Sequence, residues 1–186
     1  MAYNIEVVVG SLRRDSFNKH LGHALTKLAS AEFKFSFLDI GTLPLYSQDY
    51  DGDFPDVARN LKRQIEAADG LLFVTPEYNR SMPGVLKNAI DWGSRPWGTN
   101  SWREKPAAVC GISLGATGTA LAQQHLRNVL AYLDVPTLGQ PEIFLKYAEG
   151  FFDANGDIAN DDTRKFLQTF VERFEVWVKR HVQKGS

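Results

Sequence analysis

Residues 7–18 read VVVGSLRRDSFN, and this stretch decides the fold. Its three valines predict the end of a buried strand, because an uninterrupted apolar run is typical of a strand covered on both faces. A loop rich in polar residues follows at once, containing Ser11, Arg13, Arg14, Ser16 and Asn18. Ser16 or Asp15 is placed to cap a helix that begins near Phe17. Strand, polar loop and helix in this order predict the first unit of an α/β fold.

The alternation of strand and helix continues to the end of the chain. Runs rich in β-forming residues are predicted at 5–9, 33–38, 70–75, 107–112 and 137–144, the last with the weakest pattern. An apolar stripe at helical spacing follows each run, and the stripes begin at Phe17, Val57, Val85, Leu121 and Phe166. The final stripe is aromatic (Phe166, Phe170, Phe174 and Trp177), which we interpret as core packing.

Strands that alternate with helices predict a parallel sheet with helices on both faces. An eightfold barrel needs about 250 residues, and this chain has 186. Five strands fit better an α/β flavodoxin-like three-layer sandwich, with a five-stranded parallel sheet of order 2-1-3-4-5. We expect residues 1–186 to form a single flavodoxin-like domain of this kind.

Charge and cysteine content argue against several classes of protein. Twenty-one basic and 22 acidic residues give a net charge of −1, without the basic surplus typical of nucleic-acid binding. No apolar run suggests a signal peptide or a membrane span. The only cysteine, Cys110, lies in an apolar run and is predicted to be a reduced core residue. We therefore expect a cytoplasmic protein. The four scattered histidines lack acidic or cysteine companions, so no metal site is expected.

The loop at 10–18 occupies the predicted ligand position. In the order 2-1-3-4-5, ligands bind where the connections after strands 1 and 3 diverge to opposite faces of the sheet. A helix N-terminus there favours a phosphate, the serines and Asn18 can add neutral donors, and Arg13 or Arg14 can add a charged one. A capped helix with solvated arginines is the alternative interpretation. The Walker pattern G-x-x-x-x-G-K-[ST] is missing, which disfavours a triphosphate with magnesium.

A second motif makes the comparison with a known family specific. The loop after the third predicted strand reads TPEYNRSMPGVLKNAIDW, residues 75–92. Together with GSLRRDSFN it resembles the NADPH-dependent FMN reductase family, a flavodoxin-like group that includes bacterial quinone and chromate reductases. The likeness covers nearly the whole chain in element order and spacing. It implies non-covalent FMN, NAD(P)H as co-substrate, a small-molecule electron acceptor, and a homodimer or homotetramer in which a neighbour helps to complete the flavin pocket.

The resemblance also implies which residues bind FMN. The first segment matches the phosphate loop, the second runs along the ribityl chain and the flavin ring, and the third follows strand 4 in SLGATGTA, residues 113–120. Relatives often carry adjacent glycines where this chain has Ala116-Thr117-Gly118. The implied cofactor-binding residues are Ser11, Arg13, Ser16, Asn18, Pro76, Glu77, Tyr78, Asn79, Arg80, Ser113, Gly115 and Gly118.

Three other features have competing interpretations. Ser113-x-Gly115-x-x-Gly118 falls short of the dinucleotide fingerprint G-x-G-x-x-G, because the first glycine and the later acidic residue are missing. Cys110 is a poor phosphatase nucleophile, because it lies inside a strand without a following anion loop. A tryptophan-rich segment, DWGSRPWGTNSW at 91–102, either packs locally, lines the pocket or makes a subunit contact, and the last two are favoured.

The expected function is an NAD(P)H oxidoreductase that transfers hydride through bound FMN to quinones, with chromate, azo and nitro compounds as further acceptors. No catalytic side chain is expected, because the flavin itself carries the hydride chemistry. Both substrates would use one face of the flavin in turn, which predicts a ping-pong mechanism. A flavodoxin-type electron carrier and a non-catalytic module that binds FMN or another phospholigand remain the alternatives.

Overall fold

The computed structural model describes residues 2–182. Its strands form one parallel sheet and are β1 (Tyr3–Val9), β2 (Phe33–Phe37), β3 (Gly70–Val74), β4 (Ala107–Ser113) and β5 (Ile143–Lys146). The helices are α1 (Phe17–Leu28), α2 (Asp56–Ala67), α3 (Gly84–Gly93), α4 (Ala120–Tyr132) and α5 (Asp161–His181), with a short 3₁₀ helix at Gln48–Tyr50. In the described residues, no helix combines the length and the apolarity needed to cross a membrane.

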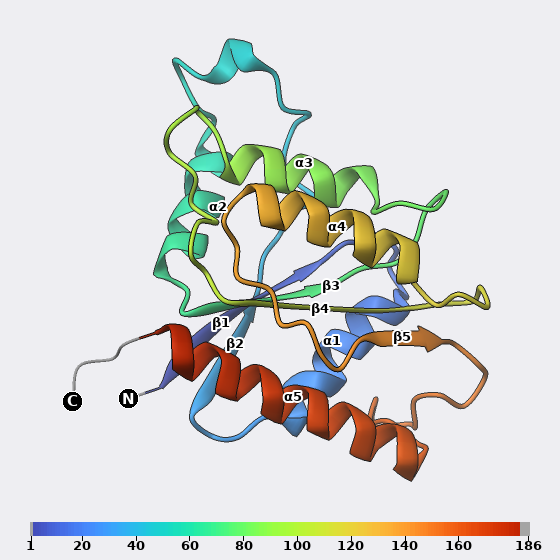
Figure 1. Cartoon of the computed structure of the whole chain (residues 1–186). Coiled ribbons are helices and arrows are strands. Elements are labelled where there is room, and N and C mark those ends of the chain that lie inside the picture. The colour runs from blue at the N-terminus through green and yellow to red at the C-terminus, as the bar shows by residue number, and fades with distance from the viewer. Residues whose placement is uncertain (1, 183–186) are drawn as a thin grey trace.

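The sheet has the strand order β2-β1-β3-β4-β5, which confirms the predicted flavodoxin-like order. The start of β1 and the end of α5 lie at the same edge of the molecule, on the left of Figure 1. Neighbouring strands are parallel throughout, with Val9 opposite Val74 and Val74 opposite Cys110. Their carboxyl ends therefore meet at one edge of the sheet, where the predicted ligand crevice should open.

The prediction of the fifth strand was correct only at its end. Thr137 makes a single bridge to Ala107, and the backbone N–H of Leu138 donates to the Ala107 carbonyl over 2.8 Å. The chain then leaves the sheet and returns at Ile143, which pairs with Cys110. Pro141 lies in this gap and has no N–H to donate to a strand ladder. The segment before Pro141 therefore contacts the sheet at one point, and the strand itself begins only after the proline.

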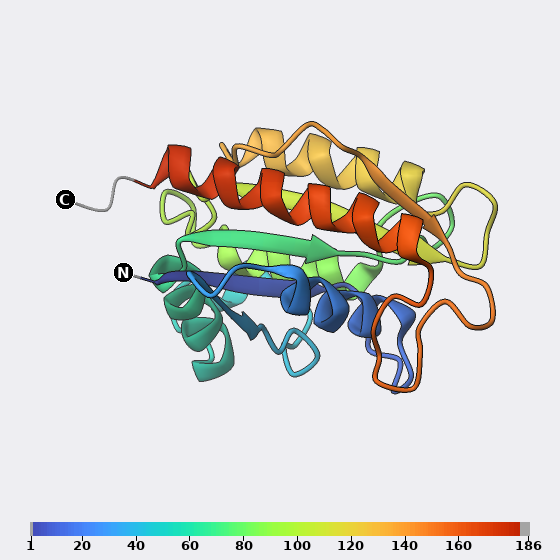
Figure 2. The ribbon, with the colours of Figure 1, turned by 90° about the horizontal axis from the view of Figure 1, so that it is seen from below.

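Helices cover both faces of the sheet and divide the core in two (Figures 1 and 2). One apolar cluster lies under α2, α3 and α4, and the other lies under α1 and α5. Strand β3 is buried along its whole length, as its uninterrupted apolar sequence predicts. Leu71 and Phe73 belong to the first cluster, whereas Leu72 and Val74 belong to the second. The alternation of side chains along one strand therefore supplies both layers of the sandwich.

Two of the three tryptophans in the segment 91–102 are core residues, contrary to the expectation of a pocket or interface. Trp92 and Trp102 are fully buried. Their indole N–H groups donate to the Pro44 and Ile90 carbonyls over 2.7 and 3.0 Å, respectively. Trp92 belongs to α3 and Trp102 to the loop that follows it, and both rings are buried because the single indole donor of each has a carbonyl partner in the core. Trp97 differs, since 76% of its surface is exposed.

The predictions for the last helix and for the cysteine are largely confirmed. Phe170 and Phe174 are buried against the sheet, but Phe166 at the start of the stripe is 43% exposed. Cys110 is fully buried in β4, and this burial raises the pKa of its thiol. A protonated, inaccessible thiol is a small apolar core residue and not a nucleophile.

Close approach between β3 and β4 makes one glycine indispensable. A Cβ added to Gly111 would lie 2.1 Å from the Thr75 carbonyl oxygen, whereas one added to Gly84 at the start of α3 meets nothing within 4 Å. We expect Gly111→Ala to lower the free energy of unfolding by about 2–3 kcal/mol through overpacking. Gly84→Ala should raise it by up to about 1 kcal/mol. Urea unfolding of both variants checks this, and equal effects would contradict the packing seen at Gly111.

Candidate functional site

The loops after β1, β3 and β4 lie together at the carboxyl ends of the strands (right-hand end of Figures 1 and 2), and residues of all three line one crevice. The chain leaves β1 toward α1 on one face and leaves β3 toward α3 on the other, so the crevice lies at the predicted switch point. Its volume is about 340 Å³. The lining residues are Ser11, Arg13, Ser16, Phe17, Asn18, Pro76, Glu77, Tyr78, Ile112, Ser113, Leu114, Gly115, Thr117 and Gly118.

The loop after β1 ends in a capped helix with a free cation beside it. Ser16 is the N-cap of α1, and its Oγ accepts a hydrogen bond from the backbone N–H of Lys19 over 3.3 Å. The Arg13 guanidinium lies 5.0 Å from the centre of the Phe17 ring. Within residues 2–182 no carboxylate or carbonyl accepts a hydrogen bond from it. A helix N-terminus and an unpaired guanidinium together form an anion site.

Arg13 and Arg14 are adjacent in sequence but differ in position. Arg13 lines both the crevice and a neighbouring hollow that also contains Leu12 and Lys19, whereas Arg14 lines that hollow alone. Both arginines lie in the same loop of the sequence, and only the family motif favoured Arg13 over Arg14 as the phosphate ligand. The geometry makes the same choice, because only Arg13 faces the crevice between the three loops.

The side chain of Asn18 has a structural partner. It is 3% exposed, its Nδ2 donates to the Ile112 carbonyl over 2.9 Å, and its Oδ1 accepts from the Ile112 N–H over 3.0 Å. The amide therefore ties the first turn of α1 to β4. The sequence indicated Asn18 as a donor for a ligand and gave no sign of this structural bond, because Ile112 is 94 residues away.

The loop after β3 divides into a part that lines the crevice and a part that projects from it. Pro76, Glu77 and Tyr78 line the crevice. Tyr78 and Ser81 exchange two backbone hydrogen bonds of 2.9 and 3.0 Å. Between them, Asn79 and Arg80 have φ values of 51° and 67°, as in a type I′ turn. Both residues are exposed at the tip of this turn, outside the lining to which the family motif assigned them.

The carboxylate of Glu77 serves as the cap of a distant helix. Its Oε2 accepts hydrogen bonds from the backbone N–H groups of Leu121 and Ala122, over 3.0 and 3.2 Å. Helix α4 has no side-chain cap of its own at Thr119, so Glu77 satisfies donors that would otherwise lack a partner. The negative charge also lies at the positive end of the helix dipole. Glu77 thereby fixes the second loop against the third.

The third loop lines the crevice and requires a glycine where it approaches β5. Ser113 Oγ donates to the Gly118 carbonyl in a short hydrogen bond. Gly118 has a φ of +59°, and a Cβ there would lie 2.8 Å from the carbonyl carbon of Phe144, so only glycine fits. Thr117, whose role the departure from the family pattern left open, is part of the lining. Ser113, Gly115 and Gly118 all lie where the family motif predicts.

Three lining residues were missed by the sequence reasoning, namely Phe17, Ile112 and Leu114. Phe17 belongs to the apolar stripe of α1 and Ile112 to an apolar strand, so both patterns indicate core. Leu114 is 67% exposed at the crevice, and its position directly after β4 was the available signal. Within residues 2–182, no group of three His, Cys, Asp or Glu side chains is arranged to hold a metal ion.

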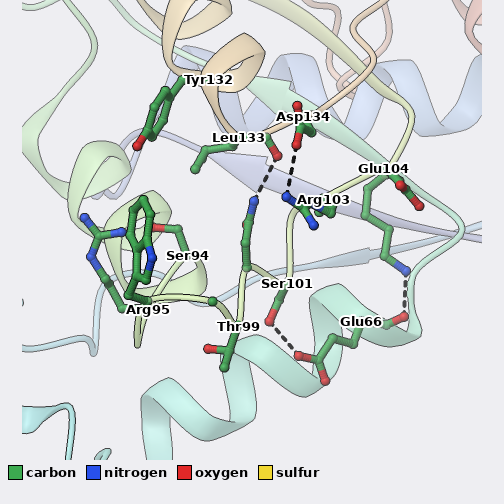
Figure 3. Close-up of a pocket in the computed structure, with 14 residues that line it drawn as sticks. Glu66, Ser94, Arg95, Thr99, Ser101, Arg103, Glu104, Tyr132, Leu133 and Asp134 are labelled. Carbon is green, nitrogen blue, oxygen red and sulfur yellow. Dashed lines mark hydrogen bonds and ion pairs between the residues drawn. The ribbon is translucent and has the colours of Figure 1, made fainter.

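A larger hollow of about 720 Å³ lies at the opposite end of the sheet, where the strands begin (Figure 3). Its polar lining is mostly paired: Asn100 donates to the Leu133 carbonyl, Ser101 to Glu66, and Arg103 forms an ion pair with Asp134. Ligands of parallel α/β sheets bind at the carboxyl ends of the strands. The smaller crevice is therefore the candidate functional site, despite the greater volume of this hollow.

Comparison with known proteins identifies the family. The model of the NADPH-dependent FMN reductase family matches residues 3–150. The chain belongs to this family. A 2-hydroxy-1,4-benzoquinone reductase from a Burkholderia species is 64% identical over 179 residues, which cover 96% of this chain and 98% of that protein. A quinone reductase from Pseudomonas putida is 46% identical and covers 95% of each chain. The solved structure of FerB, a flavoenzyme NAD(P)H:(acceptor) oxidoreductase from Paracoccus denitrificans, is 45% identical, with a TM-score of 0.93 over 97% of this chain and 99% of that one.

The crevice of this FMN reductase family member fits FMN. The unpaired Arg13 guanidinium and the N-terminus of α1 suit a phosphate at one end. Pro76, Tyr78 and the glycine-containing third loop, which closely approaches β5 at Gly118, suit a flat ring in the remaining space. The buried amide of Asn18 and the helix-capping carboxylate of Glu77 hold the loops in this arrangement, and Arg13 takes no part in these bonds.

The Asn18 amide gives the first prediction for the site. Asn18→Ala leaves the buried N–H and carbonyl of Ile112 without their side-chain partner, so the free energy of unfolding should fall by about 2–4 kcal/mol. Asn60→Ala is the matched control, because that exposed amide bonds only to Gln64 on the same helix. It should change stability by less than about 0.5 kcal/mol. Chemical denaturation compares the two, and similar small effects would refute a structural role for Asn18.

Proposed function

We propose that this chain is an FMN-containing NAD(P)H oxidoreductase that reduces quinones, with chromate, azo and nitro compounds as further acceptors. The observation that carries this proposal is the unpaired Arg13 guanidinium at the N-terminus of α1, inside a crevice at the switch point of the sheet. Relatives that align over nearly their whole length are named as quinone reductases. When bound, FMN supplies hydride-transfer chemistry between a pyridine nucleotide and an acceptor.

The residues of the crevice bind and orient, and none has to act as an acid or a base. Its ionisable lining side chains are Arg13, Glu77 and Tyr78. Arg13 with Ser11 would hold the phosphate, while Glu77 already accepts two hydrogen bonds from α4. The backbone of residues 76–78 and of the third loop would follow the ring. Residues 1–186 would act as one FMN-binding domain in the cytoplasm, where NAD(P)H is available and the lone cysteine stays reduced.

A visible spectrum followed by addition of NADPH tests this function against its alternatives. A yellow protein that bleaches rapidly with NADPH, and regains its colour when a quinone is added, is a reductase. A yellow protein that does not bleach is an electron carrier of the flavodoxin type. A colourless protein that takes up no FMN favours a non-catalytic module and would overturn the proposal.

Steady-state kinetics should follow a ping-pong mechanism. FMN would occupy the single crevice among the three loops, so nucleotide and acceptor would use the same exposed face of the flavin in turn. Double-reciprocal plots at several fixed quinone concentrations should be parallel, and excess quinone should inhibit competitively against NADPH. Intersecting lines together with a detectable ternary complex would rule out a shared site.

Arg13 should bind the cofactor phosphate and Arg14 should not. A hydrogen bond to a charged partner contributes about 1.5–3 kcal/mol, so Arg13→Ala should weaken FMN binding roughly 10- to 150-fold. Riboflavin lacks the phosphate and should bind this variant almost as it binds the original protein. Arg14→Ala is the matched control and should change neither affinity. Equal losses for both flavins in Arg13→Ala, or a larger FMN loss in Arg14→Ala, would show that the assignment is wrong.

A homodimer or homotetramer is part of the proposed function, with Trp97 in the subunit contact. Trp97 and Tyr132 are 76% and 71% exposed and line the same hollow, and exposed aromatic residues are typical of interfaces. Trp97→Glu should shift the sedimentation coefficient toward that of the monomer or alter the KM for the acceptor. The matched control Phe166→Glu, on the exposed side of α5, should do neither. An unchanged assembly and KM would exclude Trp97 from the contact.

A further inference from the structure

The aromatic ring of Phe17 lies between the free cation of the crevice and the end of β5. On one side, the Arg13 guanidinium is 5.0 Å from the ring centre. On the other, the ring stacks on Tyr147 with a centroid distance of 3.7 Å and an interplanar angle of 13°. Phe17 is the first residue of α1 and also lines the crevice. Phe17, which the sequence assigns to the core stripe of α1, thus provides an aromatic platform beside the anion site, and this platform is its ring.

Among the described residues, the Arg13 guanidinium makes no hydrogen bond or ion pair, and its aromatic contact is with Phe17. No carboxylate, carbonyl or hydroxyl within residues 2–182 bonds to it, and only the Arg13 backbone N–H contacts Ser11 Oγ, at 3.4 Å. A long exposed side chain otherwise samples many rotamers. The negative face of an aromatic ring attracts a guanidinium without using its hydrogen-bond donors. The ring therefore restricts the side chain and leaves its N–H groups available to a ligand.

Tyr147 connects this platform to the third loop of the crevice. Its backbone N–H donates to the Ser113 carbonyl over 2.8 Å, and Ser113 Oγ in turn bonds to Gly118. The Tyr147 ring also lies 6.4 Å from Phe151, so it is supported from the segment after β5. The stack Arg13–Phe17–Tyr147 lies at the N-terminus of α1. Through the backbone of Tyr147 it links the first loop to the third.

We propose that Phe17 is a positioning residue for the cofactor phosphate. Its ring holds the Arg13 guanidinium in the crevice before the ligand binds, and Tyr147 holds the ring. The phosphate affinity of the site is therefore set partly by the segment that follows β5, which does not line the crevice. This inference rests on the proposed function, because it requires FMN as the ligand and Arg13 as its phosphate donor.

Titration of FMN and riboflavin into the full-length, flavin-depleted protein tests the proposal. Loss of a cation–π contact worth about 0.5–2 kcal/mol predicts that Phe17→Leu weakens FMN binding about 2- to 30-fold. Riboflavin binding should change less than twofold, and Phe17→Tyr should retain the affinity for FMN. Tyr147→Leu, which leaves α1 unaltered in sequence, should reproduce part of the selective loss. Phe166→Leu removes a 43% exposed ring from α5 and is the matched control.

A double-mutant cycle separates positioning from simple packing. In an Arg13→Ala background, Phe17→Leu should cause no further loss of FMN affinity, because the cation that it positions is gone. Equal losses for FMN and riboflavin, an undiminished effect in the Arg13→Ala background, or no effect at all would overturn the proposal. If instead Arg13→Ala itself fails to discriminate FMN from riboflavin, the assignment of Arg13 is wrong. If the unaltered protein binds no FMN, the proposed function falls with it.

Discussion

The two hydrogen bonds between the Asn18 amide and the backbone of Ile112 hold the crevice together. They fix the first turn of α1 against β4, across β1 and β3 in the sheet order. A buried amide that satisfies both a donor and an acceptor tolerates little displacement, since a broken bond leaves a buried polar group unpaired. The position of Ser16, Phe17 and Arg13 follows from this attachment. The anion site is therefore a consequence of how a helix is tied to a strand.

Some polar side chains of the crevice support its loops, whereas the charged donor Arg13 remains free. Asn18, Glu77 and Ser113 all bond to the chain's own backbone. These bonds connect the three loops to each other and to α4. Among the lining residues, Arg13 is the one cation, and its guanidinium donors are unused while it lies against an aromatic ring. Such preorganisation lowers the entropic cost of binding and concentrates the positive charge where a phosphate would lie.

The two ends of the sheet have opposite characters for a related reason. At the carboxyl ends, parallel strands deliver loops and helix N-termini, with their unpaired N–H groups, to one place. At the other end, the loop between α3 and β4 bonds to the residues that follow α4: Asn100 donates to the Leu133 carbonyl, and Arg103 forms an ion pair with Asp134. The larger hollow therefore contains mostly satisfied groups, with Trp97 exposed at its edge. Volume alone says little about where a ligand binds.

The sequence by itself determined the parallel five-stranded sheet, its order, the switch point and the three loops that line the crevice. The strands and helices follow from local apolar periodicity, the strand order and the switch point from the fold class that this alternation predicts, and the third loop from the resemblance to the family. The tertiary structure was needed to show which side chains line the crevice and which bond to other parts of the chain. Asn18 and Glu77 match the family motif, yet their side chains bond to Ile112 and to α4, 94 and 44 residues away. Trp92 in α3 and Trp102 after it are buried in the core, and Phe17 supports Arg13, because contacts between distant segments determine where a side chain points. A local sequence pattern does not indicate such contacts.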